Sequence, residues 1–213
     1  MEFKFTIQDY QTRAAEAVAR VFEGQPKTEG FQYVRDLGTV HVDARNATEQ
    51  WHYDDDDANG YRNAEIVLTP AQLLDNVRAI QRSNHIERSD ALHRDLGVVE
   101  LDVEMETGTG KTYVYTETIF ELNRRYGWSK FIIVVPLVAI REGIAKSLQT
   151  TERHFAERYG KRIWWFVYDS DRLNEIDAFA SRNDISVMIV NMQAFNASFD
   201  ESKNRDGRGG DKA

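Results

Sequence analysis

Cysteine is absent from all 213 residues of the chain. Its absence excludes disulfide bonds, thiolate nucleophiles and zinc sites with cysteine ligands. Long apolar runs are also missing: the longest, 131–140, spans ten residues, whereas a membrane-spanning helix needs about 20. The first residues contain no apolar core that could act as a secretion signal. We therefore expect a soluble protein of a reducing compartment, the cytoplasm, with no membrane partner.

Positive charge is in the minority, since 27 Lys and Arg residues face 35 Asp and Glu residues and the net charge is −8. This balance excludes a protein that coats nucleic acid through bulk positive charge, although a local basic groove remains compatible with it. Hydrophobic residues make up 41% of the chain, enough for a packed core. The length fits one domain with an elaboration, or one domain and part of another.

Candidate metal ligands show no suitable spacing. The five histidines are not paired in a metal-binding pattern. The four adjacent carboxylates at 54–57 could hold a hard cation, but their spacing does not alternate, and a solvated loop is favoured. Neither a Ser-His-Asp arrangement nor a catalytic carboxylate pair can be assembled from spacing alone.

The N-terminal part of the chain predicts two helices separated by an irregular region. The first helix is expected from Thr6, as its cap, to Phe22, and region 24–61 has no sustained period. A second helix begins with Thr69 as cap, Pro70 at the first position and Gln72 at the third. The inward residues are expected to be Tyr10, Ala14, Val18 and Val21 in the first helix, and Leu73 or Leu74, Val77 and Ile80 in the second. Residues 84–95 are polar and predict a connection.

From Val98 onward, apolar runs of strand length alternate with helical patterns. Strands are expected at 98–103, 131–135, 163–168 and 185–190, and the second of them is expected to be buried. A helix is expected after each of the first three, the last of them at 173–181. This alternation predicts an α/β fold, a parallel sheet with helices on both faces. The expected organisation is an N-terminal extension at 1–97, an α/β part at 98–199 and a loose tail at 200–213.

A glycine-containing loop lies between the first expected strand and its helix. Its glycines allow successive backbone N–H groups to converge on an anion at the helix N-terminus. Lys111 would reach the β- and γ-phosphates of a nucleotide, and the Thr112 hydroxyl would bind Mg²⁺. The general pattern has glycine where Met105 stands, and a glycine-rich turn with a surface lysine is the alternative. The loop residues are Thr107, Gly108, Thr109, Gly110, Lys111 and Thr112.

Several segments resemble the restriction (Res) subunits of type III restriction–modification enzymes. Residues 103–115 resemble their first helicase motif, in which methionine is usual at position 105, and 132–143 resemble the next motif. Tyr10-Gln11 is similar to an upstream Tyr-Gln pair that contacts adenine in many superfamily 2 helicases. Segments 74–81 and 188–196 also resemble these subunits. The resemblance covers nearly the whole chain and fades in 30–61 and after Asp200.

The resemblance implies an ATP-driven motor that uses ATP and Mg²⁺. Two RecA-like domains would hold ATP, a nuclease domain would follow, and a methyltransferase (Mod) subunit would supply recognition of the DNA sequence. Gln11 would contact adenine, and 107–112 would hold the triphosphate and Mg²⁺. A turn from Pro136 to Gly143, with Arg141, would contact the backbone of double-stranded DNA independently of sequence. The alternative for Gln11 is a polar surface residue, and for Arg141 a solvated side chain.

The resemblance also implies that 98–199 is an incomplete first RecA-like domain. The strand at 187–190 ends in the uncharged Asn191, and Asp200-Glu201 follows a poor strand, so the acidic motif of a motor is not found. We therefore expect this chain alone to bind ATP without hydrolysing it or cleaving DNA. We also expect it to expose a sheet edge and an apolar face, which lower its solubility. A small P-loop kinase, for which no arginine-rich lid is visible, and a non-catalytic nucleotide- or DNA-binding fragment remain alternatives.

Overall fold

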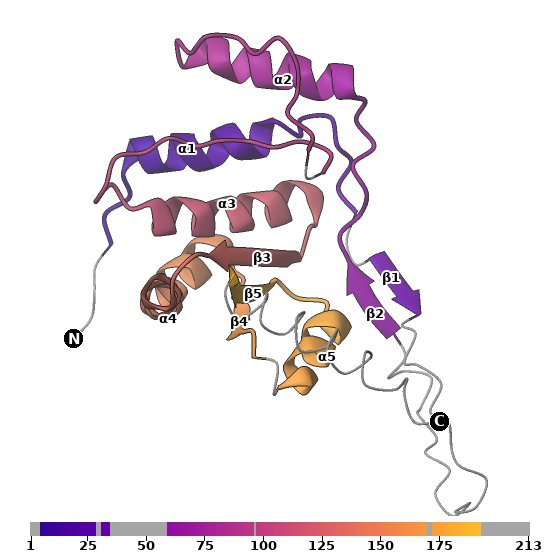
Figure 1. Cartoon of the computed structure of the whole chain (residues 1–213), viewed down its shortest axis with the longest axis vertical. Coiled ribbons are helices and arrows are strands. Elements are labelled where there is room, and N and C mark those ends of the chain that lie inside the picture. Colours follow the sequence, from indigo (N-terminus) through magenta and orange to yellow (C-terminus); the bar gives the residue numbers. More distant parts are fainter. Residues whose placement is uncertain (1–4, 29–30, 35–58, 96, 170–171, 193–213) are drawn as a thin grey trace, which may run out of the picture.

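A three-stranded parallel sheet lies between helices in the computed structural model (Figure 1). The structure describes residues 5–28, 31–34, 59–95, 97–169 and 172–192. The strands are β3 (Lys130–Val135), β4 (Trp164–Val167) and β5 (Ser186–Asn191), in the order β3-β5-β4. Both strand pairs are parallel, with Ile133 opposite Ile189 and Val167 opposite the same residue. The predicted α/β class with a parallel sheet is confirmed, as are the strands expected from 131, 163 and 185.

One face of the sheet packs against the two longest helices, α3 (Lys111–Tyr126) and α4 (Val138–Tyr159). Side chains alternate between the faces of a strand, so Ile133 and Ile189 share this face. Helix α4 turns Ile144, Leu148 and Phe155 toward the sheet, and all three are buried. The buried residues of this core are Tyr113, Ile119, Phe120, Val135, Ile144, Leu148, Phe155, Ile185, Val187 and Ile189.

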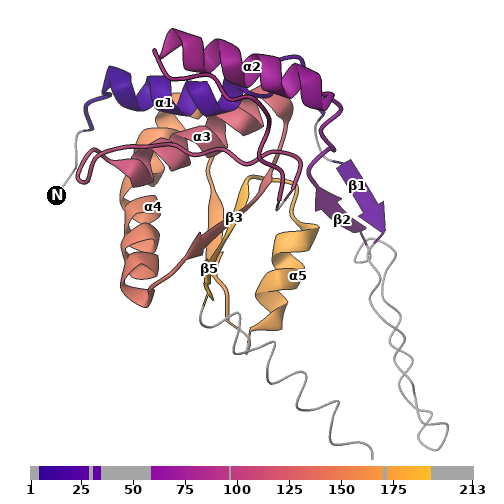
Figure 2. The same ribbon diagram turned by 45° about the horizontal axis from the view of Figure 1, so that its top comes forward.

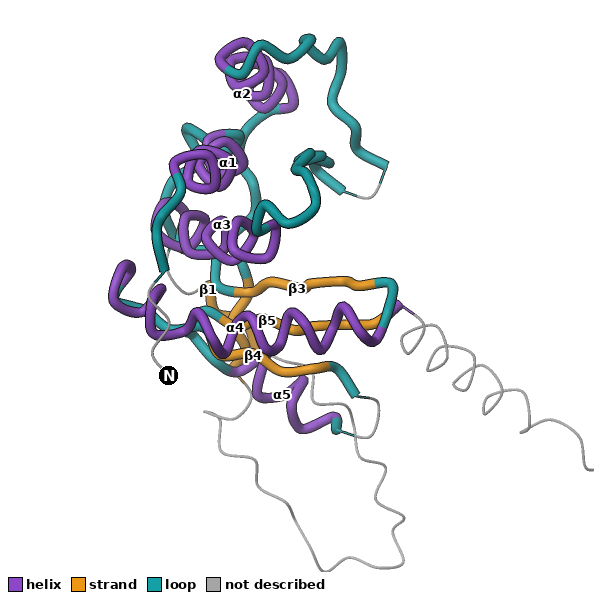
Figure 3. The backbone as a smooth tube through the Cα atoms, turned by 90° about the vertical axis from the view of Figure 1, so that its left-hand side faces the viewer, coloured by secondary structure: helices purple, strands orange, loops and turns teal. Residues whose placement is uncertain are grey.

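The opposite face is partly covered by α5 (Leu173–Ser181), which lies across the sheet from α3 (Figure 3). The ring of Phe179 is 6.0 Å from that of Phe166 on β4. The Lys130 ammonium donates hydrogen bonds to the carbonyls of Phe179 (2.6 Å) and Arg182 at the end of this helix. Burial lowers the pKa of Lys130 to about 8. A cation here satisfies carbonyls that a helix leaves without partners.

Helix α1 (Asp9–Arg20) packs along α3 on the side away from the sheet (Figures 1 and 2). Its buried residues are Gln11, Ala15 and Ala19. Of the predicted inward residues, Val21, directly after the helix, is buried. Within α1 the buried face is displaced by one position from the prediction, because two alanines at i and i+4 allow the two helix backbones to approach more closely than larger side chains would. The predicted Thr6 cap was also wrong: the helix begins after Gln8, which makes no side-chain cap.

Helix α2 (Pro70–Ser83) lies outside α1 and begins as predicted. The Thr69 hydroxyl accepts from the Gln72 N–H (3.3 Å), and the Gln72 side chain accepts from the Thr69 N–H (2.9 Å). Leu73 is fully buried in a second core. The buried residues of that core are Val21, Phe22, Leu73, Tyr126 and Trp128.

The strand expected at 98–103 is not formed. Val99 and Leu101 pack against the second core instead of joining the sheet. The Glu100 N–H donates to the His93 carbonyl (2.8 Å) rather than to a neighbouring strand. The predicted strand is therefore wrong, because Val99 and Leu101 are partly buried against helices, a packing that needs no strand partner.

A short antiparallel pair, β1 (Phe31–Val34) and β2 (Asn59–Arg62), was not predicted. Asn63, directly after β2, attaches this pair to the body. Its side-chain oxygen accepts from the N–H groups of Ser129 (2.8 Å) and Lys130 (2.9 Å), and its amide donates to the Lys130 carbonyl (2.7 Å). The amide thus continues the hydrogen bonding of β3 on the side where, among the described residues, no strand pairs with it.

Other sequence-based expectations have more limited outcomes. The acidic runs 54–57 and 200–201 and the tail 200–213 lie outside the described residues, and the proposed domain boundaries stay a prediction. Within the described ranges, no helix is both long enough and apolar enough to cross a membrane, and no group of His, Asp and Glu residues has the arrangement of a metal site.

Strand β3 exposes apolar side chains, contrary to the prediction that it is buried. Ile132 and Val134 are each 56% exposed, although both lie on a strand of the central sheet. They lie on the same face of the sheet as α5, but this helix covers β4 and β5 and leaves β3 open. On β5, Val190 is the register partner of Val134 and is buried. An exposed apolar strand is a site for self-association.

We predict that Val134→Thr reduces self-association without unfolding the chain. The change should alter the free energy of unfolding by less than about 0.5 kcal/mol, since the side chain is half in water. The matched variant Val190→Thr buries a hydroxyl and should cost about 1–3 kcal/mol. Urea unfolding and concentration-dependent light scattering measure both effects. Equal destabilisation by the two variants would show that this face of β3 is covered.

Candidate functional site

The glycine-containing loop leads directly into the N-terminus of α3. Gly108 and Gly110 have φ angles of +85° and +86°, in the left-handed region that favours glycine. Gly110 is the N-cap of α3 and provides no side-chain acceptor for the first N–H groups of the helix. Free N–H donors and the helix dipole both favour negative charge at this end of α3.

Two side chains of the predicted site lie in the first turn of α3. Lys111 is exposed and forms no ion pair with any carboxylate in the described part of the chain. Thr112 follows it and is half-buried. A lysine with this freedom can turn toward an anion at the helix start, and the hydroxyl beside it is placed to bind a cation that accompanies the anion.

Helix α1 brings Tyr10 and Gln11 to this loop. The Tyr10 hydroxyl donates to the Thr109 carbonyl at 3.0 Å, and the Gln11 side-chain amide donates to the same carbonyl at 2.9 Å. Gln11 is only 9% exposed, so its interpretation as a polar surface residue was wrong. The folded chain thus joins residues 98 and 99 positions apart in sequence, which composition and periodicity did not indicate.

Gly110 is in close contact with Gln11. A Cβ atom at position 110 would lie 2.5 Å from the Gln11 amide nitrogen, whereas a Cβ at Gly108 would meet nothing within 4 Å. A side chain at 110 would therefore displace the Gln11 amide from the Thr109 carbonyl. The two glycines have the same backbone conformation but different surroundings.

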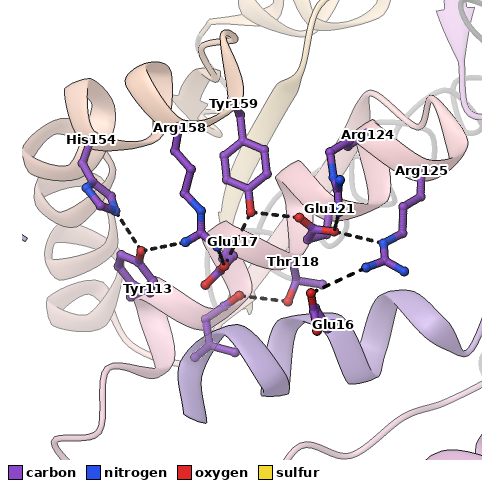
Figure 4. A network of polar contacts seen from close by, with 11 residues as sticks. Glu16, Tyr113, Glu117, Thr118, Glu121, Arg124, Arg125, His154, Arg158 and Tyr159 are labelled. Atoms are coloured by element: carbon purple, nitrogen blue, oxygen red, sulfur yellow. Dashed lines mark hydrogen bonds and ion pairs between the residues drawn. The ribbon is translucent and has the colours of Figure 1, made fainter. Parts of the chain in front are cut away.

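A buried polar network connects the start of α3 to the end of α4 (Figure 4). The Tyr113 hydroxyl is 2.8 Å from the His154 Nε2 atom and accepts from Arg158 at 3.3 Å. Arg158 also forms a 2.6 Å ion pair with Glu117, which is fully buried. Burial raises the pKa values of Tyr113 and Glu117 and lowers that of His154. This network was not predicted from the sequence. Its signal there is the i, i+4 spacing of Tyr113 and Glu117 on α3 and of His154 and Arg158 on α4, which places each pair on one helix face.

A second carboxylate, Glu121, lies one turn further along α3. Its side chain accepts from Arg124 (2.6 Å), Arg125 (2.9 Å) and Tyr159 (3.0 Å). Burial disfavours its ionised form, but these hydrogen bonds outweigh burial and hold the pKa of Glu121 below its usual value. Arg125 also approaches Glu16 of α1 at 3.9 Å, which adds a charged contact between the two helices.

The predicted DNA-contact residues surround the start of α4. The segment from Pro136 to Gly143 was predicted to be a turn, but most of it is helical. Helix α4 begins at Val138 and includes Arg141 and Gly143. Arg141 donates to the neighbouring Glu142 carboxylate at 3.0 Å and is 23% exposed. Pro136 is exposed, and a Cβ at Gly143 would meet nothing within 4 Å, so this helix start is open.

Comparison with known proteins identifies relatives of the chain. The profile of the family described as "Type III restriction enzyme, res subunit" matches residues 4–211. The EcoPI Res subunit of Escherichia phage P1 is 40% identical over 112 residues, which is 52% of this chain and 11% of that protein. The EcoP15I Res subunit of Escherichia coli is 38% identical over 112 residues, with the same two shares. The StyLTI Res subunit of Salmonella typhimurium is 40% identical over 116 residues, 46% of this chain and 12% of that protein.

We predict that Gly110→Ala destabilises the chain more than Gly108→Ala. Each alanine must adopt a left-handed conformation, at about 1–2 kcal/mol. Gly110→Ala should cost about 1 kcal/mol more, because it also removes the hydrogen bond from Gln11 to the loop. In a Gln11→Ala background the two alanine variants should become equally costly. Urea unfolding of the six proteins tests this, and an undiminished difference in that background would contradict the contact.

Proposed function

This chain belongs to the Res subunits of type III restriction enzymes, a helicase-like family, and on that premise we propose that it binds ATP at the start of α3. The observation that carries the proposal is the left-handed Gly110 N-cap, which leaves the first N–H groups of α3 free beside Lys111 and Thr112. In this proposal the N–H groups of 108–112 hold the phosphates, Lys111 neutralises the β- and γ-phosphates, and Thr112 binds Mg²⁺.

Gln11 is the proposed adenine contact. Its side chain carries both a donor and an acceptor, which match the N6 amino group and N7 of adenine. The amide already lies at the loop, 2.9 Å from the Thr109 carbonyl. Guanine and hypoxanthine carry an oxygen in place of the N6 amino group, so the same amide would meet two acceptors and bind less favourably. Gln11 would therefore select adenine nucleotides.

The whole protein is proposed to use this site in an ATP-driven motor. The chain spans about a tenth of the length of the curated relatives it matches, with 11% of the EcoPI Res subunit covered. In the proposal, ATP-dependent movement along DNA and endonuclease cleavage are activities of the whole protein. Sequence recognition would come from a Mod methyltransferase subunit. The N-terminal extension, 1–97, supplies α1 and therefore completes the nucleotide site.

The start of α4 is the proposed contact with the DNA backbone. The helix begins two residues after the exposed Pro136, and Arg141 lies in its first turn. A chain of net charge −8 can bind DNA only through such a local site, so binding by the chain alone should be weak, sensitive to salt and indifferent to sequence.

We predict that Lys111→Ala weakens MgATP binding about 10- to 100-fold, since hydrogen bonds to charged groups contribute about 1.5–3 kcal/mol. The fold should remain, because this side chain is exposed. Isothermal titration calorimetry measures the affinity, and thermal unfolding verifies the fold. Lys146→Ala, which removes an exposed lysine from the middle of α4, is the matched control and should bind ATP as the wild type does. Equal affinities of wild type and Lys111→Ala would refute the site.

We predict that Arg141→Ala lowers the salt dependence of duplex binding by about one unit, as expected when one phosphate contact is lost. Glu142→Gln should have the opposite effect on affinity, because it releases Arg141 from its ion pair. Fluorescence anisotropy with unrelated duplexes at several salt concentrations tests both. Arg153→Ala removes a comparable ion-paired arginine further along α4 and is the control. A slope unchanged by Arg141→Ala would exclude a phosphate contact there.

A further inference from the structure

Among the described residues, two buried polar atoms, one on α1 and one on α3, have no hydrogen-bond partner. In the described part of the chain, the Thr12 hydroxyl and one carboxylate oxygen of Glu117 are among the few buried side-chain atoms that lack a partner. The hydroxyl lies near enough to the carboxylate to favour its ionised form, but burial outweighs it and the pKa of Glu117 remains raised. A buried carboxylate oxygen without a donor is costly, and a hydroxyl can rotate to supply one.

The other oxygen of Glu117 is held firmly from the opposite side. Arg158 of α4 contacts it at 2.6 Å and the Tyr159 hydroxyl at 3.5 Å (Figure 4). Arg158 is itself held by Tyr113, which pairs with His154. The carboxylate is thus anchored to the core formed by α3 and α4, while its second oxygen has no partner among the described residues and the Thr12 hydroxyl of α1 acts on the same carboxylate. A small approach of α1 toward α3 would satisfy both unpartnered atoms.

Thr12 directly follows Gln11 in the first turn of α1, so a contact that holds the backbone at Thr12 also positions Gln11. In the structure, Gln11 and Tyr10 both donate to the Thr109 carbonyl and hold the first turn of α1 on the loop. To contact a base, the Gln11 amide must give up its bond to this carbonyl. The first turn of α1 then needs another attachment, and the Thr12 hydroxyl opposite Glu117 is placed to provide it.

We propose that Glu117 is a positioning residue for adenine recognition: it accepts a hydrogen bond from Thr12 and thereby holds Gln11 over the phosphate loop when nucleotide is bound. This inference rests on the proposed ATP site. Glu117 touches neither phosphate nor base. Its removal should therefore weaken the preference for adenine and leave the binding of the phosphates nearly unchanged.

The test compares three ligands in the presence of Mg²⁺: ATP, ITP and inorganic triphosphate. Calorimetric affinities are measured for the 213-residue wild-type chain and for Thr12→Val, Glu117→Gln and the double variant. Thr12→Val should lower the ratio of ATP to ITP affinity several-fold and change triphosphate affinity less than twofold. Glu117→Gln keeps an amide oxygen that can accept from Thr12, so it should lower the ratio less than Thr12→Val does. The double variant should show the ratio of Thr12→Val, because that substitution already removes the bond. Thr12→Ser, which restores the hydroxyl, should restore the ratio.

Thr118→Val is the matched control, because the Thr118 hydroxyl donates to the Val114 carbonyl of its own helix (2.8 Å) beside Glu117. It should leave the ratio at the wild-type value. If Glu117→Gln does not fold, Thr12→Val alone decides. An unchanged ratio in Thr12→Val, with Lys111→Ala still weakening ATP binding and Gln11→Ala still lowering the ratio, overturns this inference and leaves the proposed function standing. A wild type that binds no ATP, or a ratio unaffected by Gln11→Ala, overturns both.

Discussion

The packing of α1 along α3 is the contact on which the candidate site depends. Helix α3 carries the loop at its N-terminus, but only the close approach of α1 brings a second set of side chains to it. Ala15 and Ala19 are fully buried and allow this approach, and Gln11 lies on the same face one turn earlier. Larger side chains at the two alanine positions would separate the helices, and the Gln11 amide would no longer reach the Thr109 carbonyl.

Buried charge on α3 strengthens this arrangement at some cost in stability. Glu117 and Glu121 are one helix turn apart, yet the pKa of one is raised and that of the other lowered. Glu121 accepts from two arginines and a tyrosine at the rim of the core, whereas Glu117 has one arginine and an oxygen without a donor. A buried ion pair with an unpartnered oxygen, such as that of Glu117 with Arg158, rarely stabilises a core as well as apolar residues do. Its presence next to the site suits a role in positioning more than one in stability.

The sheet shows how far an α/β pattern can be interpreted without structure. Three of the four expected strands pair in parallel, because runs rich in branched residues followed by helices leave few alternatives. The segment 98–103 has the same pattern but packs on helices. Strand β3 shows the opposite outcome: the strand forms, but the face that carries Ile132 and Val134 is exposed. Hydrophobic pattern predicts that a side chain favours burial, and it does not specify the surface that buries it.

The sequence by itself determined local features: the presence of the helices, the start of α2 at Thr69 and Gln72, and the glycine loop before Lys111. These depend on backbone preferences and hydrogen bonds within a few residues, so the pattern of the neighbours is sufficient. The contact of Gln11 with the loop was suggested by a family resemblance, and only the tertiary structure placed it there. The network around Glu117 had no such indication. The Gln11 contact and the Glu117 network both depend on burial between helices that are distant in sequence. Whether a buried polar group loses more from desolvation than it gains from its partners is decided only when those helices pack.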